Sequence, residues 1–249
     1  MQYTKILIVI TLPILLMTNY SSANDGGPNK LNAEKWYEKA NAYLDSKDVQ
    51  KALEASTMAI RLDQNHGEAY LLRCGIYMTL DRYDEAISDC NKAMTLDPSS
   101  AASAYSLRAH GYINKGEYDK AISDCNKALE MQPRVSLTYI TRARALINKK
   151  QYDRAILDCD RALEINPDSD DAYSVRGLAY LMKGNYRMAI VDSNKALAIN
   201  PMGAKAYACR GIAHTRLGDE EQAAKDLLAA ARLGDKSVQK LLKSVGIDW

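Results

Sequence analysis

The sequence contains no phenylalanine and only three histidines in 249 residues. Its charges nearly cancel, because 33 Lys and Arg stand against 31 Asp and Glu, for a net charge of +2 at pH 7. Without a strongly basic surface we expect no nucleic-acid partner. The scarcity of histidine, and the lack of any Cys/His spacing suited to zinc, leave few groups for catalysis or metal binding. We therefore expect neither an enzyme nor a metal or other cofactor.

Long apolar runs are equally scarce, and the longest lies at the amino terminus. Lys5 precedes an apolar run over residues 6–17, and small residues follow up to Ala23. The run is shorter than the roughly 20 residues of a membrane span, and Pro13 interrupts it. A positive start, a short apolar stretch and small residues predict a secretory signal over residues 1–23, with export to the periplasm or the cell exterior.

The residues after the predicted signal contain a linker and a cleavage position. Residues 24–32 include Gly26, Gly27 and Pro28, which disfavour helix, so we expect a flexible linker there. Cleavage before Asn24 would release the rest of the chain. The alternative is an uncleaved anchor, and membrane contact is expected only if this segment is retained.

A period of 34 residues covers most of the remaining chain. The clearest markers are alanines spaced by 34 residues, with one interval of 35, at Ala52, Ala86, Ala121, Ala155, Ala189 and Ala223. In each unit large, small and large residues, such as Tyr105, Ala109 and Tyr112, share one face of a helix at 100° per residue. A second helix repeats this logic, so each unit predicts an antiparallel helix pair. The six units cover residues 33–66, 67–100, 102–135, 136–169, 170–203 and 204–236.

This pattern resembles the tetratricopeptide repeat family. The resemblance implies an all-α fold, a right-handed superhelical solenoid of six antiparallel helix pairs whose first helices line a concave groove. Residues 237–249 follow the last unit, and four apolar residues there recur at helical spacing, which predicts a capping helix and tail: Val238, Leu241, Leu242 and Val245.

Charged residues recur at two repeat positions. Units two to six carry Arg at the seventh position and Asp at the twenty-third, whereas the first unit has Lys39 and Ala55 there. This shared absence favours an ion pair inside each unit over a basic ladder for an acidic ligand. The predicted structural pairs are Arg73 with Asp89, Arg108 with Asp124, Arg142 with Asp158, Arg176 with Asp192, and Arg210 with Asp226.

The five cysteines are an odd number for an exported chain. Cys90, Cys125 and Cys159 occupy one repeat position in different units, too far apart for bridging. The favoured interpretation is that the cysteines are small, buried, free thiols. A disulfide between Cys74 and Cys90, on the facing helices of one unit, is the alternative.

The groove predicted from the resemblance holds a mixed set of side chains. Apolar residues would be buried by an extended or helical peptide, and Arg144 with two asparagines would fix its register. The alternative is that the polar residues only solvate this face. The predicted peptide-groove residues are His110, Asn114, Ile140, Arg144, Ile147, Asn148 and Leu178.

These observations predict an exported, non-enzymatic protein-protein interaction scaffold or assembly factor that binds a protein or peptide segment in its groove. The second hypothesis is a membrane-tethered component of an envelope, secretion or pilus-like assembly, held by an uncleaved amino terminus. The sequence makes no prediction of the partner's identity or of the oligomeric state.

Overall fold

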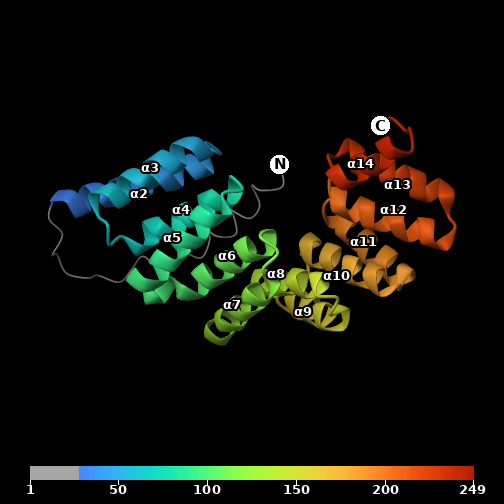
Figure 1. Ribbon diagram of the computed structural model, residues 1–249, viewed down its shortest axis with the longest axis horizontal. Helices are drawn as coiled ribbons and strands as arrows, with labels where there is room; N and C mark the ends of the chain where they lie inside the picture. The colour runs from blue at the N-terminus through green and yellow to red at the C-terminus, as the bar shows by residue number, and fades with distance from the viewer. Residues whose placement is uncertain (1–27) are drawn as a thin grey trace. The chain divides into compact units, whose positions relative to one another are not determined.

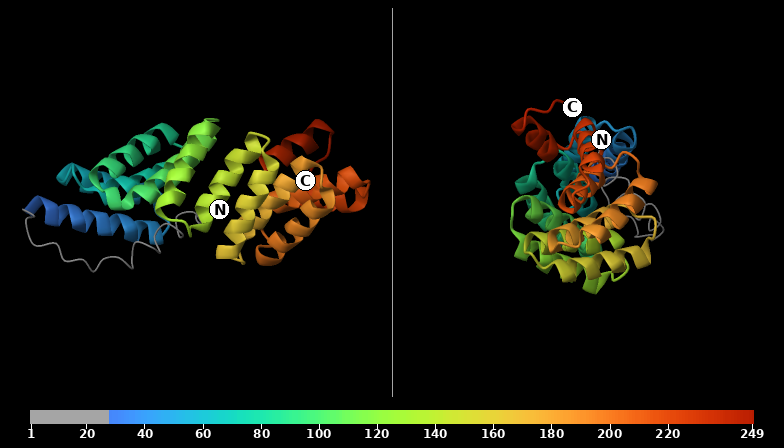
Figure 2. Two further views of the ribbon diagram at one scale, coloured as in Figure 1. Left: turned by 90° about the horizontal axis from the view of Figure 1, so that it is seen from below. Right: turned by 90° about the vertical axis from the view of Figure 1, so that its right-hand side faces the viewer.

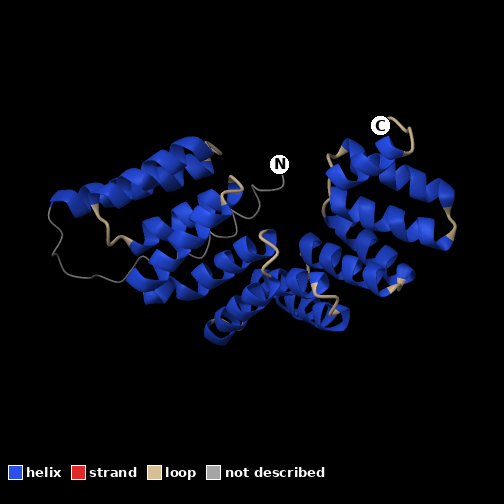
Figure 3. Cartoon of the chain, viewed as in Figure 1, coloured by secondary structure: helices blue, strands red, loops and turns tan. Residues whose placement is uncertain are grey.

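The computed structural model describes residues 28–249, and this part of the chain is helical without a strand (Figure 3). The predicted all-α class is thereby confirmed. The predicted signal over residues 1–23 lies outside the described residues. Within residues 28–249, no helix combines the length and the apolar character that crossing a membrane requires.

The described chain divides into two compact units, with the boundary between residues 128 and 129. The first unit contains α2 (Pro28–Asp45), α3 (Val49–Leu62), α4 (Gly67–Thr79), α5 (Tyr83–Leu96), the 3-10 helix η2 (Pro98–Ser100), α6 (Ala101–Asn114) and most of α7 (Tyr118–Met131). The second contains α8 (Ser136–Asn148), α9 (Tyr152–Ile165), α10 (Asp170–Lys183), α11 (Tyr186–Ile199), α12 (Ala204–Leu217), α13 (Glu220–Arg232) and α14 (Lys236–Ser244). Within each unit, consecutive helices joined by short turns pack side by side (Figures 1 and 2).

Small residues allow the paired helices to approach closely. Gly211 on α12 is an example, because a Cβ atom there would lie 2.9 Å from Cγ of Leu227 and 3.1 Å from Cβ of Asp226 on α13. The recurrent alanines of the second helices, such as Ala189 and Ala223, are buried as well. The alanine period in the sequence therefore marks the contact between the helices of each pair.

The described amino-terminal helix begins earlier than the sequence predicts. α2 starts at Pro28, so residues 28–32 of the predicted 24–32 linker are helical. Proline is well tolerated in the first turn of a helix, where its missing N–H has no intrahelical partner. The prediction that Pro28 opposes helix is wrong for this reason.

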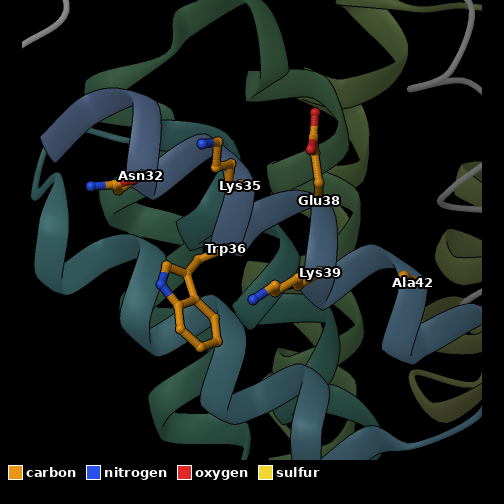
Figure 4. A pocket seen from close by; sticks show the side chains of 6 residues that line it. All are labelled: Asn32, Lys35, Trp36, Glu38, Lys39 and Ala42. Atoms are coloured by element: carbon orange, nitrogen blue, oxygen red, sulfur yellow. The ribbon is translucent and has the colours of Figure 1, made fainter. Parts of the chain in front are cut away.

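One face of α2 is adapted to water. Lys35, Glu38 and Ala42 are exposed, and with Trp36 and Lys39 they line a shallow hollow (Figure 4). The Lys39 ammonium lies 4.4 Å from the centre of the Trp36 ring. In the second repeat the residues equivalent to the exposed three are buried against α3: Ala69, Leu72 and Ile76. The charged side chains of α2 thus stand where later repeats contact a preceding repeat, as in a terminal repeat.

The carboxyl-terminal helix α14 covers α13, the second helix of the last repeat. Val238 and Leu242 are buried and pack with Ala230 and Ala231 of α13. Asp235 caps α14, because its carboxylate accepts hydrogen bonds from the backbone N–H groups of residues 237 and 238 at 3.0 Å. The structure therefore contains a capping helix, which begins at residue 236.

The favoured interpretation of all five cysteines as free thiols is wrong for one pair. Cys74 on α4 and Cys90 on α5 form a disulfide, and their Cα atoms lie 5.6 Å apart, within bridging range. The other three, Cys125, Cys159 and Cys209, are free and buried. Burial raises the pKa of the Cys209 thiol to about 11, which leaves it protonated and poorly nucleophilic at neutral pH.

Candidate functional site

The recurrent arginines lie in structural ion pairs. In repeats two to six, Nε and Nη2 of the arginine donate to the two carboxylate oxygens of the aspartate in the same repeat. The Nε–Oδ2 distances run from 2.6 to 2.8 Å. The five Asp side chains are buried. The remaining Nη1 can link to the preceding repeat, since Arg73 donates to Thr57, Arg176 to Asp160 and Arg210 to Asn194. These arginines are committed to holding helices together and are not a ladder for an acidic ligand.

The predicted groove residues separate into buried and exposed sets. Ile140 is 3% and Ile147 8% exposed, so a partner cannot reach either side chain, and their placement on a solvated apolar face is wrong. The physical reason is that successive first helices contact one another, as α10 does with α8 and α12, and large side chains at the edges of these contacts are covered. Leu178 on α10 remains 39% exposed.

The two asparagines of the predicted groove are exposed but bind within their own helices. Nδ2 of Asn114 donates to the backbone oxygen of His110, and Nδ2 of Asn148 donates to that of Arg144, both at 2.9 Å. His110 is half-buried. His110 and Asn114 belong to the first unit, and the other predicted groove residues belong to the second.

A charged cluster joins three first helices of the second unit. Nη2 of Arg144 on α8 donates to Oδ1 of Asp171 on α10. The charges of both residues act on Lys205 of α12. Burial lowers the pKa of Lys205 and the charge of Arg144 lowers it further, whereas Asp171 and Asp235 raise it. Two turns after Asp171 on α10 stands the exposed Leu178. We call Arg144, Asp171, Leu178 and Lys205 the first-helix face of the second unit.

Sequence reasoning identified two members of this face and missed two. Asp171 and Lys205 occupy the second position of their repeats, one of the positions that point away from the core. That position was the available signal, but it did not show that Asp171 would bind Arg144 or that burial and Arg144 would disfavour the charge of Lys205.

The second repeat position is acidic in the first two repeats, at Glu34 and Glu68. Oε2 of Glu34 on α2 lies 3.2 Å from Nε2 of His66, and this contact lowers the pKa of Glu34. Glu68 on α4 lies in a hollow next to them. Partial burial raises its pKa, His66 acts in the opposite direction, and the charges of Glu34 and Asp97 raise it further. The charge at the second repeat position therefore changes along the chain, from Glu34 and Glu68 in the first two repeats to Lys205 in the sixth. Among residues 28–249 no group of three His, Cys, Asp or Glu side chains is arranged to hold a metal ion.

Replacing Glu68 with glutamine is expected to stabilise the protein at neutral pH. Because the pKa of Glu68 is raised in the folded state, the unfolded state gives up this proton at a lower pH than the folded state does. The ionised carboxylate therefore lowers the stability of the fold at neutral pH. The advantage of the variant should shrink as the pH falls toward about 4.3, the pKa of an unperturbed glutamate, and vanish below it. Urea unfolding at pH 7 and pH 4 measures the difference, with Glu54→Gln on an exposed site as control. An equal gain at both pH values would contradict this account.

Comparisons with known proteins agree on the repeat. Family models described as tetratricopeptide repeat match residues 36–101, 102–135 and 170–201, and one described as TPR repeat matches residues 143–184. A curated relative, DnaJ homolog subfamily C member 7 homolog of Dictyostelium discoideum, is 30% identical over 70 residues, which are 28% of this chain and 13% of the relative. The chain thus matches only a small part of that protein.

Two solved structures show the same fold. The APC/C hetero-tetramer Cut9-Hcn1 contains a chain that is similar with a TM-score of 0.78 and 17% identity, over 96% of this chain and 46% of that one. PilW, described as a widely conserved type IV pilus biogenesis factor, is similar with a TM-score of 0.74 and 18% identity, over 88% of this chain and 100% of that one. At these identities the similarity concerns the fold alone.

Proposed function

The chain carries tetratricopeptide repeats between residues 36 and 201, and we propose that it is an exported, non-enzymatic scaffold that binds a segment of a partner protein. The observation that carries the proposal is the first-helix face of the second unit. There the surroundings of Lys205 on α12 disfavour its charge, and Leu178 on α10 is exposed. A partner segment with a carboxylate and an apolar side chain matches this face.

Lys205 has no ion-pair partner on this face. Asp171 is engaged by Arg144, and no carboxylate among residues 28–249 lies within ion-pair distance of Lys205, although Asp171 and Asp235 favour its charge from farther away. Burial and the charge of Arg144 both disfavour the charge of Lys205, and the carboxylate of a partner would offset this effect. A binding role would account for a lysine kept in such surroundings.

Export belongs to the same proposal. The amino-terminal pattern of Lys5 and the apolar run over residues 6–17 supports it, and the Cys74–Cys90 disulfide is typical of oxidising compartments. Mass spectrometry of the protein from its native cells tests the cleavage. A chain that begins at Asn24 supports a released protein, and a retained segment supports the membrane-tethered alternative, in which the protein organises an envelope, secretion or pilus-like assembly.

Replacing Lys205 with methionine tests the binding role, because it is expected to stabilise the fold and weaken partner binding together. A lysine whose pKa is lowered in the folded state is charged at a cost, since the unfolded state binds the proton more tightly. Removing the charge removes that cost at neutral pH, and the gain should fade as the pH rises toward about 10.4, the pKa of an unperturbed lysine. Urea unfolding measures the stability. Partner binding is measured by cross-linking in the native cells and quantifying the partner recovered with the protein.

The matched control is Lys240→Met on the exposed surface of α14. It should change neither the stability nor the amount of partner recovered. Undiminished recovery with Lys205→Met and also with Leu178→Asp would show that the partner binds elsewhere and would refute the proposed site.

A further inference from the structure

The outward face of α11 exposes three large apolar side chains, whereas α9 and α7 expose one each, Leu157 and Met131. Met188 is 37%, Val191 45% and Ile199 41% exposed, and Met202 in the following turn is 68% exposed. At 100° per residue the three helical residues fall within an arc of about 80°, so they form one stripe. The residues at the repeat position of Met188 in the other units are polar: Lys51, Glu85, Lys120, Arg154 and Gln222.

The fold uses this stripe only in part, because its three helical side chains remain 37–45% exposed. α11 packs against α10 and α12 with the adjoining side, whose residues are all buried: Ala189, Asp192, Ser193, Ala196 and Leu197. Apolar surface left in contact with water is costly, and exposed patches of this kind mark interaction sites.

The charges on the same face are all positive. Arg187 is exposed, and the Lys195 ammonium lies 5.2 Å from the centre of the Tyr173 ring. Neither side chain forms an ion pair with a carboxylate among residues 28–249. The single acidic residue of α11, Asp192, is fully buried and bound by Arg176. A partner for this face therefore needs apolar side chains flanked by carboxylates.

We propose that the outward face of α11 is a second docking surface, which takes an amphipathic helix of a partner protein with acidic residues beside its apolar stripe. The stripe extends along one helix, the length that a docked helix can follow. Methionine at both ends adapts to the shape of an incoming side chain.

Two other occupants fit this surface less well. Four partly exposed side chains offer far less than the about 800 Å² per partner of a standard interface, which disfavours a second copy of the chain. Lipid-binding helices carry Trp, Phe or Leu opposite several basic residues, whereas α11 exposes Met, Val and Ile with two cations, which disfavours a membrane.

A designed peptide tests the proposal on the full chain. The probe is a helical peptide with leucines at i, i+3, i+4 and i+7 and glutamates on both flanks, and its counterpart carries lysines in place of the glutamates. Fluorescence anisotropy should show at least tenfold tighter binding of the acidic peptide. Val191→Asp, and separately Arg187→Glu with Lys195→Glu, should each weaken this binding at least tenfold. Equal binding of both peptides, or binding unchanged by Val191→Asp, would overturn the proposal.

Controls separate this surface from the alternatives. Leu157→Asp changes an exposed apolar residue on α9 and should leave peptide binding intact, as should Lys205→Met on the first-helix face. Circular dichroism of Val191→Asp should match the unaltered protein, since the side chain is outside the core. Dimerisation lost with Val191→Asp, or phosphatidylserine vesicles that compete fully with the peptide, would assign the stripe to a second copy or to a membrane and reject the docked helix.

Discussion

Replacing Asp226 with alanine is expected to lower the free energy of unfolding by about 3–5 kcal/mol, because it leaves a half-buried arginine without its counter-ion. Arg210 donates to Asp226 through Nε at 2.8 Å and Nη2 at 2.7 Å, and Asp226 is 2% exposed. After the substitution the guanidinium keeps only Asn194 and the nearby ring of Tyr207. Urea unfolding followed by circular dichroism measures the loss.

A double-mutant cycle shows whether the pair acts as a unit. Arg210→Ala together with Asp226→Ala should cost clearly less than the sum of the single substitutions, because removing both partners leaves no charge unpaired. Glu221→Ala, on an exposed acid of the same helix, should change stability by less than about 1 kcal/mol. Additive effects of the two substitutions would contradict the pairing.

Replacing both Cys74 and Cys90 with alanine is expected to lower the free energy of unfolding of the oxidised protein by about 3 kcal/mol. The bridge closes a loop with a sequence separation of 16 residues, and removing it returns conformational entropy to the unfolded chain. Reducing agent should destabilise the unaltered protein by a similar amount and leave the variant unchanged. Equal stability of the oxidised and reduced unaltered protein would contradict a structural role for the bridge.

The repeat offers a matched gain of the same bridge. Arg142 pairs with Asp158 just as Arg73 pairs with Asp89, and in both cases the next residue on each helix is the position of the bridge. Ala143→Cys therefore places a thiol opposite Cys159. Thiol titration after mild oxidation should find two free cysteines in this variant, against three in the oxidised unaltered protein. Ala145→Cys should form no bridge and should show four.

The fold could be predicted from the sequence because the same packing constraints recur in every repeat. The alanines near Ala189 and Ala223 must be small for the helices of a pair to meet, and this requirement recurs every 34 residues. Asp at one position and Arg at another are present together or absent together, which predicted their pairing. Repetition turned weak local signals into a strong one.

The candidate site was less readable because its properties depend on neighbouring helices. The helical angles of Ile140 place it away from the core ring, but contacts between first helices still bury it. Lys205 differs from an ordinary surface lysine through burial by its neighbours and through the charge of Arg144 on another helix. The disulfide was underestimated because sequence separation alone does not give the distance between facing helices.

The most direct test of the proposed function is photo-crosslinking in the native cells from a single photoreactive residue at position 178. The proposed role predicts a discrete adduct with one partner protein from this position on the first-helix face, weakened by Lys205→Glu. A photoreactive residue at position 217, which is 48% exposed in the native protein, serves as the reference and should give no such adduct. An adduct of equal strength from both positions, or none from position 178, would contradict a partner-binding role for this face.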